Sequence, residues 1–505
     1  MLARIPCAAL VGVEAVPVSV EVSVERGLPC FLVVGLPDAA VRESRDRVAA
    51  ALRHARLEFP AARVTVNLSP ADLRKEGTWF DLAIALGVLA GSRQIPERRL
   101  AERLVLGELS LDGGVRSVRG VLAVALEAAR GGGRGLLVPR ENAAEAAAVG
   151  ELDVMAVRDL AEAVAWARGR DPEVVVAPLS APALDGANPL AEIRGQEVAR
   201  RALTIAAAGG HGLLLVGPPG TGKTMLARAL PSLLPPLTRD QALETSRIHS
   251  VAGTLPPGAG LLGRPPFRAP HVSATAAGLL GGGSPLRPGE LSLAHHGVLF
   301  LDELPEFSRA VLEALRQPLE SGEIVLVRAR GAVRLPARVQ LVAAMNPCKC
   351  GMLGHPRRAC RCAPPEVSRY RARLSGPLLD RIDLVVEVPI ESRRPERLWR
   401  ATMGASDDTR ARVAAAREFA RSARRATLPN AGLEGDALTS AARLSSEAER
   451  LLIDAAERWS LSARAVHRTI RVSRTVSDLA THDAIDAAAV AEALSFRIES
   501  LQMRP

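Results

Sequence analysis

GPPGTGKT at residues 217–224 is the stretch that decides the fold of this 505-residue chain. Aliphatic residues at 213–216 precede it, and a helix-forming run at 225–234 follows it. A glycine-rich loop between a strand and a helix lets backbone N–H groups face nucleotide phosphates, and the start of the helix adds partial positive charge. We therefore predict a P-loop in an α/β domain with a parallel sheet.

The residue types in this loop suit ATP bound with Mg²⁺. Lys223 supplies a mobile cation to the terminal phosphates, and Thr224 supplies a hydroxyl to Mg²⁺. A turn that merely precedes a core helix is the alternative, but such a turn requires neither Lys-Thr at these positions nor a strand before them. The other predicted nucleotide-binding residues are Gly217, Pro218, Pro219, Gly220, Thr221 and Gly222.

VLFLDE at 298–303 predicts the second half of the site. A buried strand that ends in two carboxylates delivers Asp302 to the Mg²⁺ shell and Glu303 to the attacking water. Two adjacent acids at a strand end are also common in a solvated turn. Because the same chain carries a P-loop, the sequence favours ATP hydrolysis over that alternative.

Composition divides the rest of the chain. Residues 1–168 alternate β-rich segments with helical stretches, and 169–190 is rich in proline with Ser, Asp and Gly. A second α/β block spans 191–388, and 389–505 is almost wholly periodic in the helical sense. We predict an α/β domain, a linker, an ATPase core and a helical lid, in that order.

The net charge of +10 favours a polyanionic partner, because clustered cations displace counterions from phosphates. The charge is nearly all arginine, which GC-rich codons produce without any function, so a solvated basic surface is an equally good interpretation. Aromatic residues are only 3% of the chain. Any polynucleotide is therefore expected to be held by its backbone rather than by stacked bases.

A cytoplasmic protein without a membrane partner is expected. No apolar run reaches the ~20 residues that cross a bilayer, and the amino terminus does not resemble a signal peptide. In a reducing cytosol, clustered cysteines indicate a metal site rather than disulfides. Cys348, Cys350, Cys360 and Cys362 can close a tetrahedral site for structural Zn²⁺. An iron–sulfur cluster, or His355 in place of one thiolate, is the alternative.

Longer stretches of the sequence resemble a known family. FRAPHVSATAAGLLGGG at 267–283, LSLAHHGVLFLDELPEF at 291–307 and LVAAMNPCKCG at 341–351 are similar to the ComM/YifB proteins, which are magnesium-chelatase-like AAA+ ATPases. NLSPADLRKEGTWFDLAIALG at 67–87 extends the resemblance to the amino-terminal domain. The resemblance therefore covers nearly the whole chain.

This resemblance implies further catalytic roles. Asn346 is expected to be the sensor that orients the lytic water, and Arg381 the finger that reaches the γ-phosphate held by a neighbouring subunit. Arg464 is expected to be the lid sensor on the ATP of its own subunit. Arg373 is the alternative to Arg381. A finger that acts in trans implies a ring, and we expect a homohexamer.

Two segments of the core are expected to depart from a minimal ATPase. Residues 253–290 form an insertion in the second helix of the core, and 322–336 form a hairpin before the sensor strand. Arg328, Arg330 and Arg334 of this hairpin are the candidate DNA-binding residues, because six copies in a ring would line its pore. A solvated hairpin with charged edges is the alternative.

The first domain resembles the S5-like α/β fold of Lon-type proteases, on residues 72–87 and GELSLDGGVRSVRG at 107–120. Peptide cleavage there would require a serine nucleophile and a lysine. Trp79 and Leu122 stand at those positions, so a non-catalytic scaffold is expected.

The resemblance implies an ATP-driven ring motor that acts on branched or single-stranded DNA, as a branch-migration helicase of recombination and natural transformation. The alternative is a magnesium-chelatase-like ATPase subunit that drives metal insertion or protein remodelling. A protease is disfavoured by the missing serine and lysine.

Overall fold

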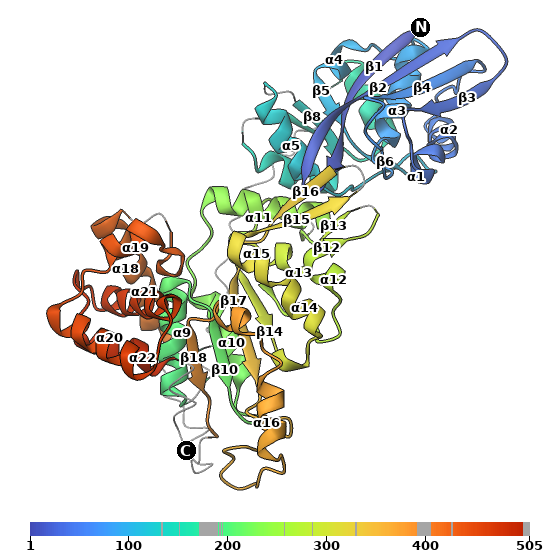
Figure 1. Ribbon diagram of the computed structural model, residues 1–505. Coiled ribbons are helices and arrows are strands. Elements are labelled where there is room, and N and C mark those ends of the chain that lie inside the picture. The colour runs from blue at the N-terminus through green and yellow to red at the C-terminus, as the bar shows by residue number, and fades with distance from the viewer. Residues whose placement is uncertain are drawn as a thin grey trace.

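The computed structural model describes residues 1–132, 135–150, 152–170, 190, 193, 195–256, 258–284, 286–328, 331–390, 406–425 and 428–497. The predicted linker lies outside the described residues except at 169, 170 and 190. Figure 1 follows the chain from a first α/β domain at one end, through a central α/β domain, to a helical domain beside it. Among the described helices, none is long and apolar enough to cross a bilayer.

The first domain is built on a long hairpin with alternating buried residues. β1 (Leu2–Val11) pairs antiparallel with β2 (Glu14–Glu25), and the sheet continues through β4 (Arg63–Ser69) to β3 (Cys30–Val34) at its edge. α3 (Asp81–Gly91) packs against both strands of the hairpin and is buried along its whole length. A helix that is apolar on every side has to be enclosed in this way.

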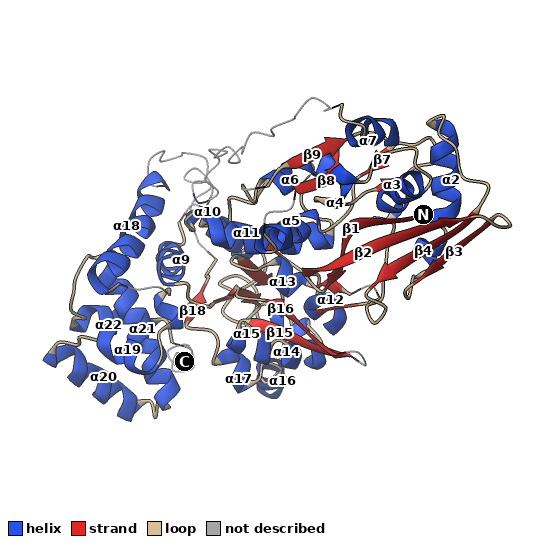
Figure 2. Cartoon of the chain, turned by 90° about the horizontal axis from the view of Figure 1, so that it is seen from above, coloured by secondary structure: helices blue, strands red, loops and turns tan. Residues whose placement is uncertain are grey.

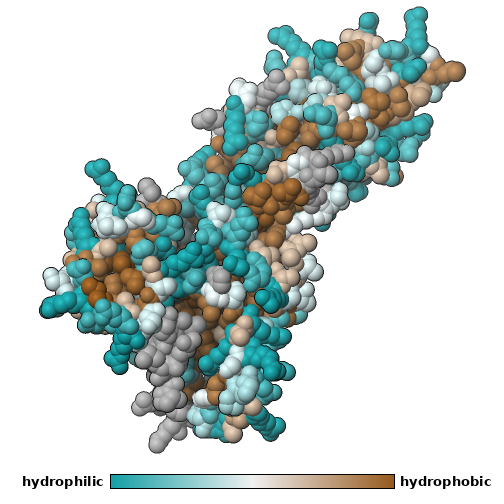
Figure 3. All heavy atoms as spheres, viewed as in Figure 1, coloured by the Kyte–Doolittle hydropathy of each residue, from teal (hydrophilic) through white to brown (hydrophobic). Residues whose placement is uncertain are grey.

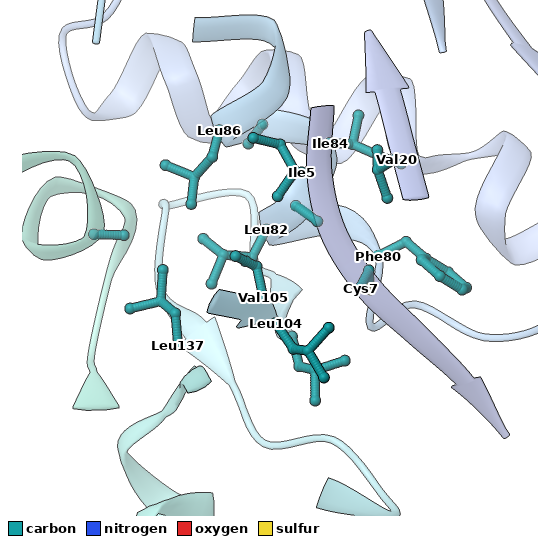
Figure 4. Close-up of a cluster of buried hydrophobic side chains, with 14 of the residues drawn as sticks. Ile5, Cys7, Val20, Phe80, Leu82, Ile84, Leu86, Leu104, Val105 and Leu137 are labelled. Carbon is teal, nitrogen blue, oxygen red and sulfur yellow. The ribbon is translucent and has the colours of Figure 1, made fainter. Parts of the chain in front are cut away.

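A second sheet shares the core of the first domain. Figure 4 shows Leu82 of α3 beside Val105 and Leu137, which come from two strands of this parallel sheet. Its order is β5 (Arg103–Val105), β8 (Gly135–Pro139) and β9 (Val154–Val157). The remaining elements of the first domain are α1 (Ala39–Arg42), α2 (Ser44–His54), α4 (Arg98–Ala101), β6 (Glu108–Leu109), β7 (Val115–Arg116), α5 (Val121–Arg130), η1 (Arg140–Asn142), α6 (Ala143–Ala147) and α7 (Leu160–Ala167).

The central domain contains a five-stranded sheet in which all paired strands are parallel. The prediction of a parallel α/β core is confirmed. The strand order is β11 (Phe267–Arg268), β14 (Val298–Leu301), β17 (Gln340–Met345), β10 (Leu213–Val216) and β18 (Leu384–Glu387). Because the carboxyl ends of parallel strands meet at one edge, the residues after β10, β14 and β17 gather there.

Helices cover this sheet and lead into its strands. α9 (Glu197–Gly209) packs against α10 (Lys223–Leu233), and α11 (Arg239–Ala252) begins with a capping box formed by Thr238 and Gln241. The other elements are α12 (Ala276–Leu280), β12 (Gly281–Gly282), β13 (Arg287–Pro288), α13 (Glu290–Leu293), η2 (Leu304–Glu306), α14 (Arg309–Ala314), α15 (Arg316–Ser321), α16 (Pro364–Arg371) and α17 (Gly376–Leu379).

The segment predicted as an insertion, 253–290, is not wholly peripheral. Its residues Phe267 and Arg268 form β11, which pairs with β14 at the edge of the core sheet. A strand of two residues carries too short a pattern to be recognised in the sequence.

The first domain rests on α11 of the central domain. Figure 2 shows α5 and α11 side by side, and the Gly120 N–H at the start of α5 donates to the Ser250 carbonyl at 3.1 Å. Arg239 adds a hydrogen bond of 2.9 Å to the Val149 carbonyl. These contacts place the first domain over the second helix of the core.

The helical domain packs beside the core, against α9. Val413 of α18 (Ser406–Arg424) and Val476 of α21 (Ala463–Leu479) share one buried cluster with Leu203 of α9. The other elements are η4 (Asn430–Gly432), α19 (Gly435–Ala441), α20 (Ser446–Arg458) and α22 (Ala487–Ser495).

Candidate nucleotide site and metal centre

The P-loop connects β10 to α10, and two of its glycines have a clear steric requirement. Gly222 caps the helix with a φ of 87°, in the left-handed region that favours glycine. A Cβ on Gly217 would lie 2.2 Å from the Val388 carbonyl oxygen, so a side chain has no room there. The backbone therefore approaches β18 closely and then turns into the helix.

Lys223 folds back over this loop. Its ammonium donates to the carbonyls of Gly217 at 2.7 Å and Pro218 at 2.9 Å. It also donates to Asn346 Oδ1 at 3.3 Å, which joins the P-loop to the residue after β17. Burial lowers the pKa of Lys223, although Asp302 and Glu303 oppose the shift. The predicted sensor and the predicted phosphate-binding lysine are thus in contact.

Thr224 and Asp302 come together beside them. The Thr224 hydroxyl donates to Asp302 Oδ2 at 2.8 Å, while Asp302 Oδ1 accepts the Glu303 N–H at 3.0 Å. A hydroxyl and a carboxylate are hard oxygen ligands, so this pair fits Mg²⁺ held between protein and phosphates. The chemistry of the donor set supports this fit.

Glu303 follows β14 in a left-handed conformation with a φ of 51° and ψ of 47°. A non-glycine residue in this region is strained, and such strain gathers at functional sites. The side chain is exposed at the edge where Lys223 and Asn346 lie. A carboxylate that takes a proton from the water attacking the terminal phosphate has to lie at this edge of the sheet, as Glu303 does.

Arg381 and Arg464 line a different cavity. Its volume is about 400 Å³, and its other lining residues are Glu313, Arg316, Gln317 and Glu320. Arg381 pairs with Glu320 at 2.6 Å, and Arg464 lies 3.9 Å from Asp380. The structure thus brings Arg464, the predicted lid sensor, close to Arg381, the predicted finger. Among the described contacts, none joins Arg464 to the P-loop.

The alternative finger, Arg373, lies elsewhere. It donates to the Pro305 carbonyl at 3.0 Å and pairs with Glu306 at 3.2 Å. Both partners follow Glu303 by two or three residues, so Arg373 contacts the segment that comes directly after the candidate base.

The four clustered cysteines converge. Sγ of Cys348 lies 3.5 Å from Cys350 and 3.6 Å from Cys360, and Cys350 lies 3.6 Å from Cys360. Cys362 completes a group whose sulfurs all lie within 4.8 Å of one another. A Zn–S distance of about 2.3 Å gives sulfur separations of about 3.8 Å in a tetrahedron, whereas a disulfide requires about 2.05 Å. The separations therefore fit a shared metal and do not fit disulfides.

The cysteine loop, residues 348–362, lies against the P-loop. Gly351 has a φ of 78°, and a Cβ there would come within 2.8 Å of Pro219 Cδ. Cys348 follows Asn346 by two residues and is fully buried. The cysteine centre therefore braces both the loop that holds phosphates and the strand end that carries the sensor.

Comparison with known proteins decides the family. The descriptions "Subunit ChlI of Mg-chelatase", "Magnesium chelatase, subunit ChlI" and "Magnesium chelatase, subunit ChlI C-terminal" match residues 20–142, 189–395 and 404–497. Competence protein ComM of Haemophilus influenzae is 43% identical over 501 residues, covering 98% of this chain and 97% of that protein. YifB of Escherichia coli is 42% identical over 492 residues, covering 97% and 96%.

The chain belongs to the ComM/YifB family of magnesium-chelatase-like proteins. True chelatase subunits are similar over a smaller part. The magnesium-chelatase 38 kDa subunit of Cereibacter sphaeroides is 30% identical over 178 residues, which is 32% of this chain and 52% of that protein. Family membership supports ATPase activity with ATP and Mg²⁺.

A second cluster in this ComM/YifB protein was not predicted. The Nε2 atoms of His295 and His296 lie 3.1 and 2.8 Å from Glu244 Oε2, just before β14. The Arg338 N–H donates to His295 Nδ1 at 3.1 Å, so the proton of the neutral ring is on Nε2, which donates to Glu244. A protonated nitrogen cannot bind a metal. The cluster is therefore a hydrogen-bonded link between α11 and β14, and burial lowers the pKa of His295 to about 4.

The hairpin of β15 (Glu323–Arg328) and β16 (Gly331–Pro336) carries the candidate DNA-binding residues. Arg334 is exposed and pairs with Glu323 at 2.8 Å. Arg330 lies outside the described residues. In the backbone register of the hairpin, Arg334 pairs with Val325 and Arg328 with Gly331.

The same hairpin contacts the first domain. A Cβ on Gly12, in the turn between β1 and β2, would lie 2.5 Å from Val333 Cγ1. Val13 is buried in one cluster with Ile324 and Leu335. Figure 3 shows apolar side chains on the surface over the hairpin, where Val327 is 82% exposed. The ribbon therefore links the first domain to the ATPase core.

Proposed function

We propose that this chain is an AAA+ ring motor that hydrolyses ATP and acts on DNA, as a branch-migration helicase of the ComM type. The main observation in support of a motor is that Lys223, Asn346 and the Thr224–Asp302 pair meet at one edge of the parallel sheet. Full-length similarity to a competence protein supports the substrate, since recombination during transformation requires DNA branches to move.

In this proposal the residues divide the work of hydrolysis. Mg²⁺, when bound, neutralises charge that develops on the phosphates. Lys223 exchanges its carbonyl partners for the terminal phosphates, and Thr224 and Asp302 hold the metal. Asn346 and Glu303 orient a water, and Glu303 accepts its proton.

The arginine pocket supports assembly into a ring. Arg381 and Arg464 line one cavity away from Lys223, so we propose that both act on the nucleotide of a neighbouring subunit. This revises the expected role of Arg464 on the ATP of its own subunit. Each site is then incomplete without a second copy, and a homohexamer closes the ring.

The remaining parts have structural roles in the proposal. Zn²⁺ is the metal favoured for four converging thiolates in a closed site. The first domain is proposed to be a non-catalytic, Lon-like scaffold, because Leu122 is fully buried where a protease requires a lysine. Its contact with the hairpin supports a role in presenting the Arg328, Arg330 and Arg334 segment to DNA.

A chelatase-like ATPase is the second candidate, favoured by the three chelatase family matches. The full-length relatives favour DNA, because the chelatase 67 kDa subunit of Heliobacterium mobile covers only 33% of this chain. The two candidate functions are distinguished by measuring ATP hydrolysis with forked DNA, with double-stranded DNA, and with Mg²⁺ plus a porphyrin. Stimulation by forked DNA alone is expected. Stimulation by the porphyrin, with none by DNA, would favour the chelatase candidate.

A further inference from the structure

Arg468 of α21 is hydrogen-bonded to the segment 379–382, which contains the predicted finger Arg381. Its Nη1 donates to the carbonyls of Leu379 at 3.0 Å and Ile382 at 3.1 Å, and its Nη2 donates to Asp380 Oδ1 at 3.0 Å. Arg381 lies between these acceptors in the sequence. A planar guanidinium with several fixed donors suits this task better than an ammonium does.

The acceptors of Arg468 lie at and just after the end of a helix. α17 ends at Leu379, whose carbonyl also accepts the Ile382 N–H at 3.0 Å, so Arg468 is a second donor to that oxygen. A cation there also interacts favourably with the helix dipole. Arg468 is 9% exposed, so its hydrogen bonds are shielded from water and hold their geometry.

Apolar packing contributes less on this side of the segment. A cavity of about 190 Å³ lies beside it, lined by Leu379, Asp380, Ile382 and Arg468 among others. Side chains that border a void lack contacts there. The hydrogen bonds of Arg468 therefore restrain the backbone next to Arg381 on the side of this cavity, while Leu378 and Ile382 anchor the segment in the apolar core.

α21 holds the same segment at a second point. His211 Nδ1 lies 2.9 Å from Asp383 Oδ2, and His211 Nε2 lies 2.7 Å from the Thr475 hydroxyl. Thr475 stands about two helical turns after Arg468. The helix thus holds both ends of a short segment whose middle residue is Arg381.

We propose that Arg468 is a positioning residue for Arg381, through which the helical domain of one subunit sets the finger presented to the next. The inference rests on the proposed function, because it requires Arg381 to act on the nucleotide of a neighbouring subunit. It adds a route of regulation: movement of α21 carries Arg381 and Arg464 together.

The test compares two arginines of the same helix. Arg471 donates to the Leu433 carbonyl and pairs with Glu434, both within the helical domain, so Arg471→Met is the matched control for Arg468→Met. We expect Arg468→Met to lower kcat for ATP about 100-fold, since misplacing a catalytic group by about 1 Å costs that much. The KM for ATP and binding of a fluorescent ATP analogue stay near those of the parent. Arg471→Met retains the kcat of the parent.

Mixed rings give a readout that a merely structural defect would not produce. Arg468→Met keeps its own ATP site but presents a displaced finger, whereas Lys223→Ala presents an intact finger but lacks an ATP site. Mixing the two is expected to restore hydrolysis well above the sum of the separate variants. Absence of recovery, with mixed assembly verified by labelled subunits, would overturn the inference.

Two further variants complete the test. If Arg468→Met does not fold, Arg468→Lys and Asp380→Ala take its place. The lysine keeps the buried charge, and Asp380→Ala removes the acceptor while leaving the helical domain unchanged. Parent kcat in both would overturn the inference. Arg381→Ala distinguishes this result from a failure of the proposed function. If Arg381→Ala is inactive, Arg381 is still the finger and only the positioning role of Arg468 is refuted. If Arg381→Ala is fully active, the role of Arg381 as a finger is refuted as well.

Discussion

Lys223 combines a charge with a largely buried position, and this combination explains its contacts. Three oxygen atoms surround its ammonium, two of them backbone carbonyls of the P-loop. Charge-assisted hydrogen bonds of this kind hold the lysine over the loop that binds phosphates. The cation is therefore held at the loop, where it can exchange these carbonyls for the phosphates of a nucleotide.

Lys223→Ala is expected to lower the ATP hydrolysis rate by at least about 100-fold, because a single preorganised donor at a developing charge is worth that much. Nucleotide binding is expected to weaken as well. Hydrolysis and binding of a fluorescent ATP analogue measure the two effects.

Glu303→Gln is expected to separate chemistry from binding. The amide keeps the shape of the side chain but cannot accept the proton of water, so hydrolysis falls about 100-fold or more while ATP binding remains. Single-turnover hydrolysis checks this outcome. Hydrolysis at the parent rate by this variant would remove Glu303 from the proposed mechanism.

At the scale of elements, the cysteine loop and the hairpin contact different parts of the molecule. The loop from Cys348 to Cys362 is packed against Pro219, so its order is linked to that of the P-loop. The hairpin instead extends from the core to the first domain, with Val325 and Val327 exposed on one face. One element lies against the ATP site, and the other joins the core to the first domain.

Cys360→Ser is expected to remove the bound metal and to destabilise the fold. Freshly purified parent protein should contain about one zinc per chain, and the variant close to none. Metal release and folding are coupled, so Tm should fall by about 5 °C, equivalent to about 2 kcal/mol for a domain of this size. Elemental analysis that finds no zinc in the parent protein would contradict the proposed metal.

The hairpin prediction concerns salt dependence. Replacing Arg328, Arg330 and Arg334 together by Ala is expected to weaken DNA binding, and to reduce the slope of log affinity against log salt by about 0.7 to 0.9 per lost phosphate contact. Arg421, Arg443 and Arg450, replaced by Ala, form a control of equal charge on the helical domain. Equal loss in both triple variants would show that net charge, rather than the hairpin, determines binding.

Local sequence patterns predicted the elements that a short motif defines. The order of strand, glycine loop and helix at 213–234, and the apolar strand before Asp302, are set by neighbouring residues, so the parallel core could be inferred. The partner of Arg464 could not, since it depends on how α21 meets a segment far away in the sequence. Glu244 and His295 were missed for the same reason: they lie 51 positions apart.

The whole molecule is arranged around one central sheet. The first domain rests on α11 and the hairpin, and the helical domain holds the segment of Arg381 through α21. A nucleotide bound at the edge of the sheet therefore has a physical route to both neighbouring domains. In a ring, repeating this arrangement would pass the state of one ATP site to the next subunit.

The most direct test of the central claim is the movement of a four-way DNA junction by the purified chain. With ATP and Mg²⁺ at low salt, the account predicts that the parent protein converts the junction into two duplexes, whereas Glu303→Gln binds the junction and leaves it unchanged. If the parent hydrolyses ATP but neither binds nor moves the junction, the account of a DNA motor is contradicted.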